Sequence, residues 1–263
     1  GNKLFKHMLD KRMTYTCGYW KNADNLDDAQ EAKLDLVCRK IGLKSGQRVL
    51  DIGCGWGSFV KYAADKYGAQ AVGITISKEQ ADYAKESCKG LPVEIRLQDY
   101  RSINEKFDHI VSIGMLEHVG YKNYRTYMET AHKCLKDDGF FLIHVIGQNR
   151  SKIVNDPWLN KYIFPNAMAP SVKQLAIAME GLFILEDWHT FAATDYYKTI
   201  MAWYGNFVRN WPKIKNDYNE QFFRMWTYGL KVTAGAHLSG TKVSLWQIVL
   251  SKSGVPEGYI SVR

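Results

Sequence analysis

The fold is decided by the stretch RVLDIGCGWG, which occupies residues 48–57. Residues 49–52 are an apolar run of strand formers, glycines stand at 53, 55 and 57, and a helical pattern starts at Ser58. Glycine allows a tight turn and a close approach of the backbone to a ligand, and the first N–H groups of the following helix remain free to face that ligand. The stretch therefore predicts a strand, a ligand-binding turn and a helix N-terminus.

The spacing of the glycines distinguishes between two classes of ligand. A dinucleotide-binding turn reads G-x-G-x-x-G, and about 20 residues later an acidic residue holds the ribose. Here the third glycine comes one residue early and Thr75 ends the next predicted strand, which disfavours a dehydrogenase. With Asp51 in the strand, D-x-G-x-G-x-G instead resembles motif I of the S-adenosylmethionine methyltransferases. The alternative is a turn that only packs the strand against the helix.

The composition fits one large α/β domain. The chain has 263 residues, a mass of 30.2 kDa, a formal net charge of +8 and a pI near 9.1. This charge favours an anionic partner, such as nucleic acid, anionic lipid or an acidic substrate, but the basic residues are scattered and fit a solvated surface equally well. Because no apolar run approaches the ~20 residues of a membrane span, we expect a protein that is soluble or lies on a surface.

The five cysteines argue against a fold held by disulfide bonds or by a bound metal. Their number is odd, they form no Cys-x-x-Cys pair, and no histidines accompany them at the spacing of metal ligands. We therefore expect no metal site and no disulfide framework, and a reducing cytoplasm fits best.

Strands and helices alternate in the first 146 residues, which predicts a doubly wound parallel sheet. The predicted strands cover residues 49–52, 70–74, 93–97, 107–113 and 140–146, and the helices cover 25–40, 58–67, 78–88 and 123–135. Ligands of such sheets bind beyond the carboxyl ends of the strands. Polar residues gather at or near those ends, namely Thr75, Asp99, Glu117 and His144. We therefore expect the chemistry there.

The second half is irregular and aromatic. Residues 148–170 contain three prolines and predict an active-site cover, followed by a helix over 171–180 and a strand over 182–188. We then expect a helix that begins at Asp195 and ends at Pro212, a second aromatic helix around residues 218–226, and a last strand over 243–250. The aromatic residues of the two helices form either a core layer or the walls of an apolar pocket that suits a lipid.

Several segments together resemble one family, the cyclopropane fatty acid synthases, with the mycolic acid cyclopropane synthases as close relatives. They run in order through nearly the whole chain: YTCGYW at 15–20, DIGCGWG at 51–57, GITIS at 73–77 with Gln80, QDY at 98–100, SIGMLEHVG at 112–120, KYIFP at 161–165, EDWH at 186–189 and MAWY at 201–204. The resemblance implies an α/β fold: the doubly wound, seven-stranded class I S-adenosylmethionine methyltransferase fold with a helical lipid-binding insertion.

The resemblance also implies the reaction. A methylene group passes from S-adenosylmethionine to the cis double bond of an acyl chain in a membrane phospholipid, and a bound bicarbonate ion deprotonates the resulting carbocation so that the cyclopropane closes. Carried over by residue, the bicarbonate is held by the side chains of Glu117, His144 and Tyr204, with the Cys17 N–H and the Ile113 carbonyl. One departure concerns Thr233, where family members often have cysteine.

For the cofactor, the resemblance divides the predicted contacts by part of the molecule. The glycine loop, Asp51, Gly53, Gly55, Trp56 and Gly57, meets the methionyl group; the ribose meets Thr75, Ile76 and Gln80; the adenine meets Asp99 and Tyr100; and Tyr15 and Thr16 close over the sulfonium.

We expect one catalytic domain over residues 1–263. It divides into an N-terminal arm and helix (1–45), a cofactor-binding core (46–146), an acyl-chain-binding cover with helices (147–242), and a final strand and tail (243–263). The resemblance implies a further N-terminal domain ahead of the catalytic part, which we expect to be missing from this sequence. A homodimer would depend on that domain, and the catalytic part would sit peripherally on the inner face of the membrane.

Three alternatives remain open. The chain could methylate an oxygen or nitrogen, or add a methyl branch to a lipid without closing a ring; the intact set of Glu117, His144 and Tyr204 argues against these. It could bind lipid without turnover, which the intact glycine loop disfavours. Nucleic acid methylation is disfavoured because MLEH at 115–118 stands where an Asn-Pro-Pro-Tyr motif would be expected.

Overall fold

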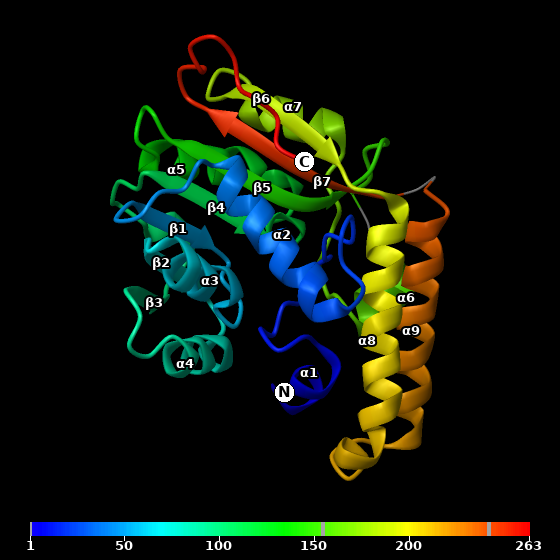
Figure 1. Cartoon of the computed structure of the whole chain (residues 1–263). Coiled ribbons are helices and arrows are strands. Elements are labelled where there is room, and N and C mark those ends of the chain that lie inside the picture. Colours follow the sequence, from blue (N-terminus) through cyan, green and yellow to red (C-terminus); the bar gives the residue numbers. More distant parts are fainter. Residues whose placement is uncertain (1, 154–155, 241–242) are drawn as a thin grey trace.

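The computed structural model describes residues 2–153, 156–240 and 243–263, and in these residues it contains one seven-stranded sheet (Figure 1). The strand order is β3-β2-β1-β4-β5-β7-β6. The strands are β1 (Arg48–Ile52), β2 (Gln70–Thr75), β3 (Val93–Leu97), β4 (His109–Ile113), β5 (Phe140–Gly147), β6 (Ile184–Thr190) and β7 (Ser244–Ser251). The order reverses beside β1, as in a doubly wound sheet, so the predicted fold is confirmed.

The predicted parallel arrangement is confirmed for β1 to β5, and β7 departs from it. It pairs antiparallel with both β5 and β6. The reason lies in the connection, because two helices packed side by side, α8 (Ala193–Ile214) and α9 (Glu220–Leu238), leave the end of β6 and return to the same end of the sheet (Figure 1). Accordingly Thr190, the last residue of β6, lies opposite Trp246 near the start of β7.

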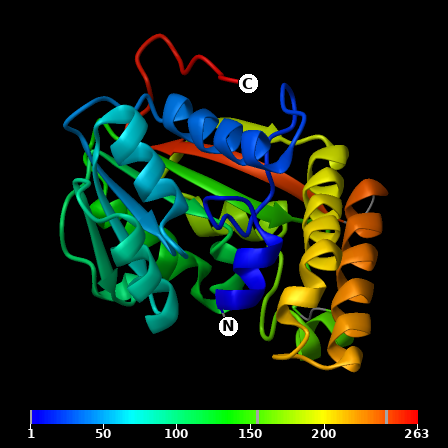
Figure 2. The same cartoon turned by 60° about the horizontal axis from the view of Figure 1, so that its bottom comes forward.

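Helices cover both faces of the sheet (Figures 1 and 2). Alternate strand residues point to opposite faces: Val49 joins the core under the helices of one face, and Leu50 joins the core under those of the other. The first face carries α2 (Leu26–Lys40), α3 (Ser58–Tyr67) and α4 (Lys78–Ser87), and the second carries α5 (Tyr124–Cys134) and α7 (Val172–Met179). The strands are therefore buried between two helical layers.

The structure adds two short helices and moves one helix end. α1 (Asn2–Met8) forms where we expected only an arm, and α6 (Pro157–Tyr162) lies in the predicted cover, of which residues 154–155 are outside the described residues. Pro212 does not end α8, which continues to Ile214. A proline removes one backbone hydrogen bond and crowds the carbonyl four residues before it, and only two helical residues follow Pro212 before α8 ends.

The aromatic residues of α8 and α9 form a core layer, as one of the two sequence interpretations held. Trp203, Phe207 and Trp226 are buried in a cluster that also takes in α1. The rings of Phe207 and Phe223 stack with centroids 5.4 Å apart. Although α8 and α9 have 22 and 19 residues, no described helix is both long and apolar enough to cross a membrane.

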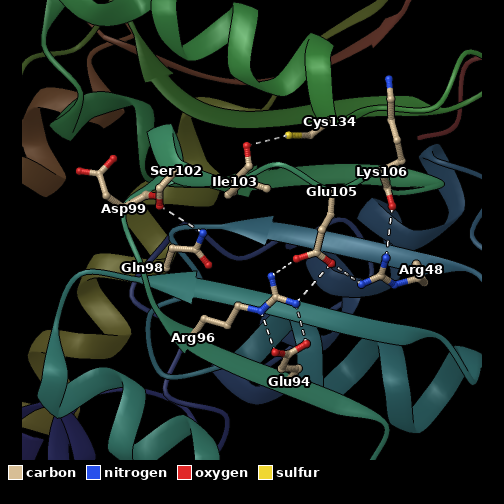
Figure 3. A network of polar contacts seen from close by, with 10 residues as sticks. All are labelled: Arg48, Glu94, Arg96, Gln98, Asp99, Ser102, Ile103, Glu105, Lys106 and Cys134. Carbon is tan, nitrogen blue, oxygen red and sulfur yellow. Dashed lines mark hydrogen bonds and ion pairs between the residues drawn. The ribbon is translucent and has the colours of Figure 1, made fainter.

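A network of ion pairs fastens the segment that follows β3 (Figure 3). Glu105 accepts hydrogen bonds from Arg96 of β3 and from Arg48 of β1, and Arg96 also donates to Glu94. At the other end of the segment, the Asp99 carboxylate accepts from Arg101. The contacts of Glu105 tie the end of this segment to β1 and β3, and the contact of Asp99 with Arg101 orients the Asp99 carboxylate within the segment.

We expect Phe207→Ala to lower the free energy of unfolding by about 3–5 kcal/mol, because the ring is fully buried between α8, α9 and α1. Val208→Ala is the matched control, since the neighbouring side chain is exposed, and should cost less than about 1 kcal/mol. Denaturant unfolding of the two variants measures both values. Equal losses would show that the aromatic layer does not stabilise the helix pair.

Candidate active site

A cavity of about 750 Å³ lies where the carboxyl ends of the central strands meet the N-terminal arm and α9. Nearly all of the residues that the sequence singled out line it. They are Tyr15, Thr16, Cys17, Asp51, Gly53, Gly55, Trp56, Thr75, Ile76, Gln80, Asp99, Tyr100, Ile113, Glu117, His144 and Thr233. The described residues thus bring the predicted cofactor loop and the predicted base site into one space.

The glycine loop forms the floor of the cavity because its backbone is left-handed. Gly53 has φ of +86°, and a Cβ added there would lie 2.4 Å from the Met115 side chain, so only glycine fits. Gly57, also predicted to contact the cofactor, is not among the lining residues and instead precedes α3 as its N-cap.

Asp51 presents an unpartnered carboxylate oxygen at this floor. The residue is 2% exposed, and its Oδ1 has no hydrogen-bond partner among the described residues. Burial raises the pKa of Asp51 to about 7, and the nearby Lys33 ammonium opposes that shift. A buried oxygen without a partner is costly, so Asp51 fits a ligand that brings a donor such as the methionyl ammonium.

The N-terminal arm closes over the loop through contacts with α2. Lys33 Nζ donates to Thr16 Oγ1 at 2.9 Å, and Gln30 Nε2 donates to the Thr16 carbonyl at 2.7 Å. The Tyr15 ring packs against Phe5, with centroids 5.0 Å apart. Lys33 is fully buried and lines the cavity, and burial lowers its pKa to about 8. Lys33 was not predicted as a site residue, because a lysine on an amphipathic helix is ordinarily expected to be exposed to solvent.

The predicted ribose and adenine contacts lie together on a second wall. Thr75 Oγ1 donates to Gln80 Oε1 at 2.9 Å, and Ile76 is 80% exposed although it lines the cavity. The Asp99 carboxylate accepts from Arg101, whose guanidinium lowers the pKa of that carboxyl. An exposed isoleucine beside polar groups suits a ligand with an apolar face and a polar edge.

Glu117 and His144 form the polar end of the cavity. Glu117 Oε1 accepts a hydrogen bond of 2.7 Å from the Ile146 N–H, whereas Oε2 has no partner among the described residues. Burial raises the pKa of Glu117 to about 7. His144 Nε2 also lacks a partner, and burial lowers the pKa of His144 well below its usual range. Two unpartnered polar atoms thus stand in one cavity, available to a small polar ligand.

Of the tyrosines on α8, Tyr196 lines the cavity and Tyr204 does not. Both lie on α8, but eight residues separate them, which is about 12 Å along a helix. The Tyr204 ring instead lies 4.6 Å from the Lys231 ammonium. Tyr196 faces Glu117 and Cys17, and loss of solvent together with those groups raises the pKa of its hydroxyl. Tyr196 was not predicted, because the family resemblance rested on the MAWY motif at 201–204, which contains Tyr204.

The apolar wall comes from α9 and the cover segment and contains few aromatic rings. α9 contributes Val232, Thr233, Ala236 and His237, and the cover contributes Leu159, Phe164, Ala167 and Met168. Of the two interpretations of the aromatic helices, the pocket wall does not hold for most of the rings, because they pack the helices together. Thr233 lies in the wall, so its difference from the family pattern falls within the site.

The comparisons with known proteins agree with this geometry. The profile of the family described as Mycolic acid cyclopropane synthetase matches residues 1–248. The chain is 53% identical over 258 residues to the cyclopropane-fatty-acyl-phospholipid synthase of Escherichia coli (strain K12), covering 98% of this chain and 67% of that protein. The chain belongs to the mycolic acid cyclopropane synthetase family. It is a methyltransferase that uses S-adenosylmethionine.

Two solved structures of the family show the same fold. The cyclopropane synthase MmaA2 from Mycobacterium tuberculosis superposes with a TM-score of 0.89 at 27% identity, covering 96% of this chain and 94% of that one. The mycolic acid cyclopropane synthase CmaA1, complexed with SAH and CTAB, gives a TM-score of 0.88 at 27% identity with the same coverage. The seven-stranded sheet with its helical insertion is therefore the fold of this family.

The raised pKa of Glu117 predicts a pH-dependent stability. Between its ordinary value of 4.5 and about 7, the unfolded chain releases the proton while the folded chain keeps it, so this residue makes the folded state less stable as pH rises. Glu117→Gln removes the effect. We expect the variant to gain about 3 kcal/mol relative to the unmodified chain between pH 4.5 and 7, and nothing further above pH 7. Denaturant unfolding across this range in bicarbonate-free buffer measures it, and a difference that does not change with pH would contradict the assignment.

Proposed function

We propose that this protein transfers a methylene group from S-adenosylmethionine to the cis double bond of an unsaturated acyl chain in a membrane phospholipid, closing a cyclopropane ring with bicarbonate as the base. The observation that carries the proposal is the pair of unpartnered atoms, Glu117 Oε2 and His144 Nε2, in the same cavity as the glycine loop. A methyl transfer alone needs the loop, whereas ring closure also needs a base.

The two groups that bind have separate chemical tasks: S-adenosylmethionine, when bound, supplies the carbon, and bicarbonate, when bound, accepts the proton. An alkene is a weak nucleophile, so much of the rate must come from holding it in line with the sulfonium in a dry site. The cover residues Leu159, Phe164 and Met168 would exclude water, and the Tyr196 ring would face the positive charge that develops on the acyl chain.

The base site favours an anion because its side chains can donate. With a pKa of about 7, a large fraction of Glu117 is protonated at neutral pH, and His144 is neutral with one N–H. Both can therefore donate to bicarbonate, and the Tyr196 hydroxyl can do the same. In this proposal Tyr196 takes the role that the sequence analysis gave to Tyr204, and the Cys17 N–H and the Ile113 carbonyl keep theirs.

For the methyl donor, the lining residues suggest which parts they meet. Asp51, Gly53, Gly55 and Trp56 would hold the methionyl group beneath Tyr15 and Thr16. Thr75, Ile76 and Gln80 would hold the ribose, and Asp99 and Tyr100 the adenine. Gly57 would act through the N-terminus of α3. Lys33 adds a positive charge near the methionyl end, where the ligand carries a carboxylate.

The surface charge supports a peripheral place on an anionic membrane. Basic residues of α8, α9 and the turn between them are exposed, namely Lys198, Arg209, Lys213, Lys215, Arg224 and Lys231. Such a set attracts anionic headgroups without an inserted helix. We propose that this charged surface contacts the inner leaflet of the membrane, that the protein has no nucleic-acid partner, and that it can form a homodimer.

The proposal is tested by incubating the chain with S-adenosylmethionine, bicarbonate and vesicles of a cis-unsaturated phospholipid, and then weighing the acyl chains. We expect a gain of one methylene together with loss of the olefin signal. A methyl branch with retained unsaturation, or an added oxygen, would assign another reaction of the same fold. Binding to the vesicles without turnover would instead show a lipid-binding protein that lacks this activity.

Two substitutions on α8 test the tyrosine assignment. We expect Tyr196→Phe to lower turnover by about tenfold to a hundredfold while adenosylhomocysteine still binds, because one donor to the base site is lost. Tyr204→Phe should lower it far less, since that ring lies outside the cavity. Turnover on vesicles and calorimetric binding of adenosylhomocysteine measure the two effects. The reverse order of effects would return the role to Tyr204.

A further inference from the structure

A row of polar residues lies behind the base site, at one register position of three neighbouring strands. His144 of β5 is opposite Gln247 of β7, and Gln247 is opposite His189 of β6. Residues at one register position of paired strands point to the same face of a sheet. Gln247 is fully buried and does not line the cavity, so a polar amide has been placed inside the sheet where an apolar side chain would be expected.

Gln247 contacts one of the two ring nitrogens of His144. Gln247 Nε2 lies 3.3 Å from His144 Nδ1. With the amide in this orientation its nitrogen faces Nδ1 and its Oε1 has no partner among the described residues; an amide nitrogen only donates, so Nδ1 accepts. A neutral imidazole has one ring proton, and that proton must then be on Nε2, the nitrogen without a partner among the described residues. The cavity therefore receives an N–H donor.

Burial and two nearby ammonium groups also keep this ring neutral. Lys33 and Lys40 of α2 and His189 of β6 face His144, and burial with these groups lowers the pKa of His144. Lys40 Nζ is 3.1 Å from His189 Nδ1 and 3.3 Å from Asp187, which also binds Arg263.

His144 also has neighbours in the cavity and on the loop after β6. Glu117 and Cys17 line the same cavity, and the Phe191 ring packs edge-on against the imidazole at 5.5 Å. A second proton on His144 would bring another positive charge close to Lys33 and Lys40.

We propose that Gln247 is a positioning residue that holds His144 in the tautomer protonated at Nε2, and thereby sets the ability of the cavity to bind an anion. This inference rests on the proposed role of His144 in binding bicarbonate. Gln247 touches neither substrate nor anion. It acts by deciding which ring nitrogen carries the proton, as a partner behind a histidine ligand does at metal sites.

The tautomer is measured directly by nitrogen-15 NMR of the full chain labelled at histidine, with His144→Asn used to assign the signals. We expect a protonated Nε2 and an unprotonated Nδ1. In Gln247→Glu the carboxylate accepts from Nδ1, so Nδ1 should become protonated, either in the other neutral tautomer or in an imidazolium. A protonated Nδ1 in the unmodified chain would overturn the proposal, and this outcome is read from the unmodified chain itself.

The kinetic test separates binding of the anion from binding of the cofactor. In Gln247→Leu we expect the half-saturating bicarbonate concentration to rise about tenfold, the equivalent of one weakened hydrogen bond, with that for S-adenosylmethionine unchanged. In Gln247→Glu the carboxylate raises the pKa of His144. The rate should therefore fall as pH rises through that value, because the ring then loses its Nε2 proton.

The matched control is Gln47→Leu, which removes a glutamine from another histidine of the same sheet. Gln47 Oε1 lies 3.3 Å from His109 Nε2, at the start of β4 and away from the cavity. This variant should keep the bicarbonate dependence and the pH profile of the unmodified chain. If the unmodified chain does not respond to bicarbonate, the proposed function of the base site fails. If it responds and the Gln247 variants respond in the same way, the role of Gln247 fails alone.

Discussion

Three polar atoms buried without partners determine how this site must be built. Asp51 Oδ1, Glu117 Oε2 and His144 Nε2 lie at the carboxyl edge of the sheet, and each such atom costs about 1–3 kcal/mol. The surrounding fold must supply that energy. It does so through the two helical layers that pack on the strands and through the aromatic cluster that packs α8, α9 and α1 together. A ligand that satisfies these atoms recovers part of the cost on binding.

Burial also sets the charge of the site. Removing water raises the pKa values of Asp51 and Glu117 to about 7 and lowers that of Lys33 to about 8, so the pKa values of all three groups lie near neutral pH. Small changes in the ligand can then move protons among them. The cofactor end and the base end share this property although different strands form them.

Much of this arrangement could be predicted from the sequence. The alternation of apolar runs and helical patterns determined the sheet, and the rule that ligands sit at strand ends pointed to Thr75, Asp99, Glu117 and His144, all of which line the cavity. Which turn of α8 lies at the cavity could not be predicted. The apolar pattern repeats in the same way over all 22 residues of the helix, so the sequence does not distinguish one turn from another. Tyr196 was missed for this reason.

Other features depended on contacts between distant segments. The sequence alone does not show that Gln247 lies beside His144, because this depends on the pairing of β7 with β5. The antiparallel direction of β7 follows in turn from the way α9 returns to the sheet. The aromatic helices show the same limit. Their composition suits a pocket wall or a core layer equally, and only packing against α1 decides between the two.

The connection from β6 to β7 makes the helix pair α8 and α9 structurally independent of the strands that shape the glycine loop. Because α8 and α9 leave and rejoin the sheet at one end, the strand register places no restriction on their length. Whole turns can be added or removed beyond the cavity, and side chains of α9 can be exchanged, while β1, β2 and β4 continue to shape the glycine loop. Selectivity for the acceptor can therefore diverge during evolution without disturbing recognition of the methyl donor.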